Sequence, residues 1–229
     1  VVNMKRVEVL RGPQGTLFGR NTIGGAVNII TTRPSGELEY TLELGAANND
    51  GRRARVSIDL PAFGDWAAAV TYFDKQEGGW VDSVYGGELG GQRGTAWRAA
   101  LRWDASEALG ADYTWTLTDR SGNGQISQLT HVRPIYADPN GQFYGGPFYE
   151  QAAAAASAER LDRIPILNSR SQENTSRIDG HTLTLDWEIT SGLRMRSISS
   201  YRDWQDDGIP EFSSFPVENA GDVIDASQA

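Results

Sequence analysis

Apolar and polar residues alternate along most of this chain with the period of two that is typical of β-strands. Between residues 37 and 44 every second residue is apolar, and glutamate or threonine occupies the positions between. The pattern returns six more times, so we predict seven strands, at residues 37–44, 53–60, 66–75, 97–104, 111–118, 178–189 and 193–202. We expect the arginines of the second run to face the glutamates of the first across an antiparallel pair. Ile198 interrupts the alternation of the last run.

The connections between these runs alternate in length. Short turns are expected at residues 61–65, 104–110 and 190–192, and longer loops at 46–51, 78–94 and 119–176. Compact domains mostly use short connections, whereas transmembrane β-barrels have short turns at one end and long loops at the other. Trp66, Trp103 and Trp187 lie beside the short turns, where an aromatic belt would meet a membrane boundary. A soluble antiparallel sandwich produces the same period, so the pattern alone leaves both architectures open.

The first residues form a different unit, in which two β-rich runs at 7–10 and 27–30 enclose a glycine-rich turn. Glycine content alone is equally compatible with an ordinary hairpin of a soluble domain. The full sequence is more specific: Arg-Gly-Pro-Gln-Gly-Thr-Leu-Phe-Gly, followed by Gly-Gly-Ala-Val-Asn-Ile-Ile-Thr, resembles the end of the plug domain of TonB-dependent outer-membrane receptors. The positions that carry the resemblance include Arg11, Gly12, Pro13, Gly15, Gly19, Gly24, Gly25 and Asn28.

This resemblance implies an all-β fold in two parts. Residues 1–34 would be the C-terminal part of a plug domain, and residues 35–229 the first part of an antiparallel transmembrane β-barrel, with a long extracellular loop at about 119–176. Seven strands are far fewer than the roughly 22 of plugged outer-membrane transporters. The chain also begins without the basic and apolar segments of a secretory signal. We therefore expect an internal fragment that cannot transport as it stands.

For the whole protein, the resemblance implies a receptor in the outer membrane of a Gram-negative bacterium. It would import a scarce nutrient, with a ferric siderophore as the leading cargo and cobalamin, haem or oligosaccharide as others. The TonB complex of the inner membrane would move the plug through an upstream segment, and no cofactor is implied. A surface receptor or adhesin that uses the barrel only as a scaffold is the alternative function. Because fold does not fix function, the resemblance leaves the substrate open.

Arg11 is the strongest single functional candidate, because the family places this arginine at the plug surface facing carboxylates of the barrel wall. Breaking such a charge-assisted pair could accompany plug movement. Glu39 and Glu43 are candidate partners, and carboxylates of strands outside the chain are others. The alternative is that Arg11 only braces its own turn.

Composition excludes several other functions. The chain has 229 residues, no cysteine, a net charge of -9 and a mean hydropathy of -0.45. The negative charge argues against nucleic acid, which selects basic surfaces. His131 and His181 are the two histidines, and neither has metal-ligand spacing or belongs to a nucleophile elbow, so we expect no enzyme and no metal site. Gly19 and Gly24 have the spacing of a phosphate-binding loop, but Gly25 stands where that motif needs lysine.

The longest predicted loop concentrates aromatic residues near an arginine. The candidate ligand contacts are Arg133, Tyr136, Phe143, Tyr144, Phe148 and Tyr149. Two interpretations stay open, a ligand-binding surface and a loop that packs upon itself. Near the end of the chain an acidic group is expected either to be solvated or to bind divalent cations between lipopolysaccharides of the surrounding outer-membrane lipid. This group consists of Asp203, Asp206, Asp207, Glu211 and Glu218.

Overall fold

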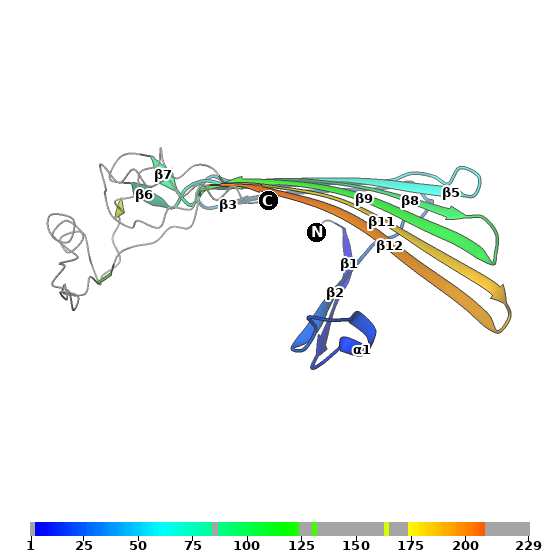
Figure 1. Cartoon of the computed structure of the whole chain (residues 1–229). Coiled ribbons are helices and arrows are strands. Elements are labelled where there is room, and N and C mark those ends of the chain that lie inside the picture. Colours follow the sequence, from blue (N-terminus) through cyan, green and yellow to red (C-terminus); the bar gives the residue numbers. More distant parts are fainter. Residues whose placement is uncertain (1–2, 84–86, 124–129, 132–162, 165–173, 209–229) are drawn as a thin grey trace, which may run out of the picture.

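The fold combines a two-stranded hairpin with one large antiparallel sheet (Figure 1). The computed structural model describes residues 3–83, 87–123, 130–131, 163–164 and 174–208. The sheet has the strand order β12-β11-β9-β8-β5-β4-β3, so that each strand lies beside its neighbour in the chain. Its strands are β3 (Glu39–Ala47), β4 (Gly51–Asp59), β5 (Trp66–Glu77), β8 (Gln92–Asp104), β9 (Leu109–Gly122), β11 (Asn174–Thr190) and β12 (Leu193–Asp207). All seven predicted strands are confirmed.

The strands extend further than the sequence pattern predicts at the end where the long connections leave. β9 continues to Gly122 and β11 already begins at Asn174, so the predicted loop at 119–176 includes four residues at its start and three at its end that are paired in the sheet. Asp119 pairs with Arg177 in this extension. The alternation disappears there because both faces carry polar residues, although the ladder of backbone hydrogen bonds continues.

β12 likewise continues through Ile198 to Asp207, and Ile198 keeps its register opposite Thr184. The predicted loop at 78–94 is also shorter than expected, since β5 runs to Glu77 and β8 begins at Gln92. Between them lie β6 (Val81–Ser83) and β7 (Glu88–Leu89), which pair with each other. The two-residue strand β10 (Arg163–Ile164), from the longest connection, pairs in parallel with β6. The two long connections therefore share a small sheet.

The two faces of the large sheet have opposite character. The hairpin lies against the face that we call the inner face, and small residues are buried there, with Ala67, Ala69 and Ala100 between 0% and 5% exposed. The opposite, outer face exposes large apolar side chains, including Tyr40, Leu42, Leu44, Val56, Ile58, Val70, Trp97, Leu183 and Trp187. A soluble sheet buries its large apolar side chains, so this distribution matches a sheet with lipid on its outer face.

Aromatic pairs mark two levels on the outer face. Trp66 and Trp103 stack beside the short turns with ring centroids 5.4 Å apart, and Tyr72 and Trp97 lie together six residues further along, with centroids 4.5 Å apart. Aromatic side chains favour both boundaries of a bilayer. The helix α1 (Gly15–Phe18) is one turn long, and the described residues include no helix with the length and apolarity to cross a membrane.

The hairpin consists of β1 (Met4–Arg11) and β2 (Gly25–Thr31), with α1 in the connection. The strands pair from Met4 opposite Thr31 to Arg11 opposite Gly25, as the two β-rich runs predict. Gly25 has φ of 139°, and a Cβ atom there would lie 2.4 Å from the carbonyl oxygen of Leu10. Only glycine fits this position, because both the backbone conformation and the space exclude a side chain.

Candidate functional site

The open end of the hairpin meets the inner face of the sheet at a cluster of hydroxyl groups. The Asn3 side-chain amide donates hydrogen bonds of 3.1 Å to Ser57 Oγ and to Thr71 Oγ1. These two hydroxyls, on β4 and β5, are 2.9 Å apart, and their residues are 8% and 0% exposed. The amide of Thr32 donates to the carbonyl oxygen of Asn3 at 3.0 Å. Both ends of the hairpin are thus held at one place on the sheet.

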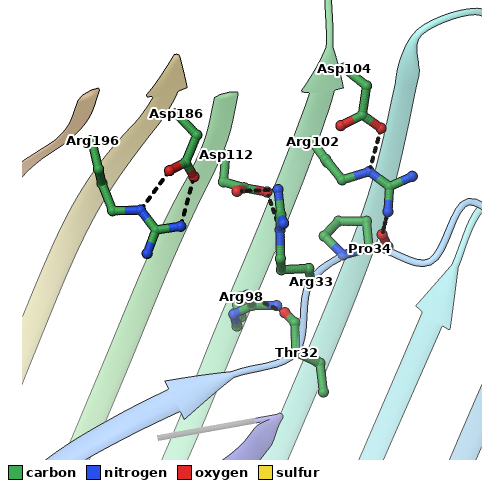
Figure 2. Close-up of polar contacts among 9 residues, drawn as sticks. All are labelled: Thr32, Arg33, Pro34, Arg98, Arg102, Asp104, Asp112, Asp186 and Arg196. Atoms are coloured by element: carbon green, nitrogen blue, oxygen red, sulfur yellow. Dashed lines mark hydrogen bonds and ion pairs between the residues drawn. The ribbon is translucent and has the colours of Figure 1, made fainter. Parts of the chain in front are cut away.

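Arg98 on β8 is the most deeply buried charged group of this contact, with 3% of its surface exposed. Its Nη2 donates to the hydroxyl of Thr31 at 3.1 Å. The same nitrogen donates to the carbonyl oxygen of Thr32 at 2.9 Å (Figure 2). Arg98 forms no ion pair with any described residue, and its Nε has no hydrogen-bond partner there. Burying an arginine without a carboxylate in contact is costly, and the hydrogen bonds to the hairpin, together with the attraction of the Asp59 carboxylate, compensate the guanidinium.

Two further arginines fasten the residues that follow β2. Arg33 binds Asp112 on β9 through Nε at 2.9 Å and through Nη2 at 2.6 Å, a bidentate pair. Arg102 on β8 donates to the carbonyl oxygen of Pro34 at 2.5 Å, and its Nε lies 2.9 Å from the Asp104 carboxylate (Figure 2). We call the contacts of Arg98, Arg102 and Asp112 with residues 31–34 the anchor. The anchor joins the hairpin to the middle strands of the sheet.

A second bidentate pair lies beside the anchor on the same face. Arg196 on β12 binds Asp186 on β11, with contacts of 2.6 and 3.1 Å (Figure 2). The inner face near the short turns is therefore lined by paired charges, while the outer face at the same level carries tryptophans. Arg55 and Glu43 form the cross-strand ion pair that the sequence predicts between the first two strands.

The predicted motif residues lie at the opposite end of the hairpin, away from the anchor. Arg11, Gly12, Pro13, Gly15, Gly19, Gly24 and Gly25 surround the turn and α1. The Arg11 side chain is exposed and contacts no described residue through a hydrogen bond or ion pair, and Glu43 binds Arg55 instead. Gln14 braces the turn by donating to the backbone carbonyl of Arg11 at 3.4 Å. The functional role of Arg11 stays a prediction.

Asn28 has a defined contact in the middle of the hairpin. Its side-chain amide donates to Glu8 at 3.1 Å, and Glu8 also accepts a hydrogen bond of 2.7 Å from Arg6. The Arg6 hydrogen bond, with the smaller contribution of Asn28, lowers the pKa of Glu8 below its ordinary value. Glu8 therefore remains a carboxylate that ties β1 to β2 at neutral pH.

A groove of about 760 Å³ lies at the other end of the sheet, where the long connections leave. Its lining combines cationic, anionic and amide side chains, among them Lys75, Gln92, Arg120, Asn123, Asn174 and Asp206. This volume is in the range of small-molecule sites. The sequence pattern does not predict this groove, because several of its residues fall in stretches without alternation that are typical of loops.

The predicted ligand contacts lie outside the described residues; these are Arg133, Tyr136, Phe143, Tyr144, Phe148 and Tyr149. Glu211 and Glu218 of the acidic group also lie outside the described residues. His181 lies on β11, where its ring accepts or donates a 2.7 Å hydrogen bond with the Tyr113 hydroxyl. Within the described ranges, no three histidine or acidic side chains are grouped to hold a metal ion.

Comparison with known proteins agrees with this architecture, although no family model matches the chain. The pesticin receptor of Yersinia pestis is 31% identical over 105 residues, which are 44% of this chain and 16% of that receptor. The metal-pseudopaline receptor CntO of Pseudomonas aeruginosa strain UCBPP-PA14 is 25% identical over 212 residues, or 88% of this chain and 29% of that receptor. Both relatives are receptors rather than enzymes, and the chain spans less than a third of either one.

A solved structure shows the same fold over most of the chain. The ferric yersiniabactin uptake receptor FyuA from Yersinia pestis superposes with a TM-score of 0.69 and 19% sequence identity, covering 91% of this chain and 30% of that receptor. The hairpin motif, the sheet with its apolar outer face and these matches all lead to one assignment. In sequence and in fold the chain is similar to the TonB-dependent outer-membrane receptors, with the fold of the end of a plug domain followed by the first strands of a β-barrel.

Proposed function

We propose that the complete receptor imports a ferric siderophore through energy-coupled movement of its plug. The observation that carries this proposal is the anchor, which joins the end of the plug to the inner face of the large sheet. We call this sheet the wall, and the anchor consists of Arg98, Arg102 and the pair of Arg33 with Asp112. The relatives named for iron siderophores support the choice of cargo. In this proposal residues 1–34 belong to the plug and residues 35–229 to the barrel, with the boundary just after the anchor.

The groove at the far end of the sheet is the proposed entry region for the ligand. It lies on the side of the long connections, which would face the outside of the cell. Its cationic and amide groups, Lys75, Arg120 and Asn123, can bind oxygen ligands of a ferric complex. The aromatic residues between Arg133 and Tyr149 are proposed as further contacts from the longest connection.

The proposed partners are the TonB complex, which would act on a plug segment that precedes this chain, and the lipid and lipopolysaccharide of the outer membrane. No catalytic role is proposed for any residue. In this proposal the energy for plug movement comes from the inner membrane through that complex.

The test is growth of the source bacterium with the complete gene deleted, with ferric siderophores supplied one at a time as the sole iron source. We expect growth to fail on one siderophore and to return with the intact gene. An Arg11→Ala copy, present at equal amounts in the outer membrane, is expected not to restore it. Unchanged growth of the deletion strain on every siderophore would refute iron uptake and favour cobalamin, sugars or passive display.

A further inference from the structure

The two ends of the hairpin converge on the wall, whereas its turn lies at the far end (Figure 1). Thr32 donates to the carbonyl oxygen of Asn3, and the next pair of the ladder is Met4 with Thr31. The last pair, Arg11 with Gly25, adjoins α1 and the turn. A pull on the chain before β1 would therefore enter the hairpin at the same end at which β2 leaves it.

The two ends are held with unequal strength. Asn3 is held by neutral hydrogen bonds to two hydroxyls, each contributing roughly 0.5–1.5 kcal/mol. Residues 31–34 are held by two guanidinium groups of the wall and by the bidentate pair of Arg33 with Asp112. Hydrogen bonds with a charged partner are roughly twice as strong as neutral ones. The start of β1 is thus the weaker attachment.

We propose that the anchor stays closed during transport and that the plug opens when β1 unzips from β2, beginning at Asn3. This inference rests on the proposed energy-coupled transport. The ladder bonds lie across the strands, so a pull applied where the strand ends meet loads one pair at a time. If β1 and β2 were instead pulled from opposite ends of the hairpin, along the strand direction, all of the ladder bonds would share the load. The anchored β2 then remains on the wall as the template on which β1 re-forms.

Two cross-links in the complete receptor test this order of events. The hairpin lock is a disulfide between Val9→Cys and Val27→Cys, which are direct cross-strand partners and are 64% and 65% exposed in this chain. The wall lock joins Arg33→Cys to Asp112→Cys with a short bismaleimide, replacing an ion pair of the anchor by a covalent link. This chain contributes no other cysteine.

The readout is uptake of radioactive iron carried by the siderophores that the source bacterium itself secretes under iron starvation. We expect the hairpin lock to abolish uptake and a reductant to restore it. The wall lock is expected to import as fast as the same double variant before linking. Loss of uptake on closing the wall lock, or full uptake with the hairpin lock closed, would overturn the proposal. Absence of uptake by the unmodified receptor would instead refute the proposed function, and the unzipping with it.

Discussion

Replacing Arg98 with alanine should weaken the anchor by about 2 kcal/mol. The guanidinium donates two hydrogen bonds to residues 31 and 32, and hydrogen bonds of charged groups contribute about 1.5–3 kcal/mol each. Part of this gain is cancelled, because a group that is 3% exposed and has one unpartnered nitrogen was desolvated at a cost. The carbonyl oxygen of Thr32 would also lose its donor in the variant. A net change of about 2 kcal/mol is roughly a thirtyfold change in an equilibrium constant.

Thiol labelling measures this local opening directly. A cysteine in place of Thr32 keeps the backbone carbonyl that Arg98 binds, and its modification rate in the complete receptor reports how often residues 31–34 leave the wall. We expect Arg98→Ala to raise the rate roughly thirtyfold, with Arg98→Lys between alanine and wild type because one ammonium cannot reproduce the guanidinium geometry. Arg93→Ala is the matched control, since Arg93 is an exposed arginine of the same strand. Equal rates in wild type and Arg98→Ala would refute the anchoring role.

Three further changes have distinct expected outcomes. Gly25→Ala should prevent the hairpin from closing, because its Cβ would meet a carbonyl oxygen at 2.4 Å. Gly15→Ala has open space around its Cβ and should be tolerated. Limited proteolysis of the plug distinguishes the two variants. Asp112→Asn should loosen the anchor by only about 1 kcal/mol, because the side chain of its partner is half exposed, and exchanging Arg33 and Asp112 should restore it in the labelling assay. The hydrogen bond from the neighbouring arginine lowers the pKa of Glu8, so ionised Glu8 stabilises the hairpin above the ordinary glutamate pKa of about 4.3, and this contribution disappears as the pH falls through the lowered value. As the pH is lowered from 7, opening of the hairpin should therefore increase in the wild type but not in Glu8→Gln. The same pH dependence of opening in both proteins would refute the role of ionised Glu8.

The sequence predicts the positions of all seven wall strands, because lipid on one face forces a regular alternation. The prediction fails at the strand ends for the same reason. Around Asp119 and Asn174 both faces contact polar surroundings, so no alternation marks residues that still pair in the sheet. At Ile198 an apolar residue stands on the inner face of an edge strand, which the pattern treats as an interruption although the backbone pairing continues.

The anchor could not be predicted from the pattern. Arg98 and Arg102 occupy ordinary polar positions of an alternating strand, and their acceptors are backbone carbonyl oxygens of Thr32 and Pro34, which have no sequence signature. The motif that identifies the family points instead to the distal turn around Arg11. The resemblance in sequence thus points to the plug, whereas the contact that fastens the plug to the sheet depends on backbone acceptors that only the fold brings within reach of Arg98 and Arg102.

The buried alanines of the inner face limit which substitutions this sheet can accept. Ala67 lies directly opposite Arg102, which donates to the carbonyl oxygen of Pro34, and Ala69 lies opposite the buried Ala100, so a larger side chain at any of these positions would have to displace its neighbours. Volume rather than polarity is then the constrained property at these positions, so serine or glycine should replace alanine more readily than leucine would. These buried positions of the inner face are constrained like the core of a globular protein, while the lipid-facing side is free to exchange one large apolar residue for another.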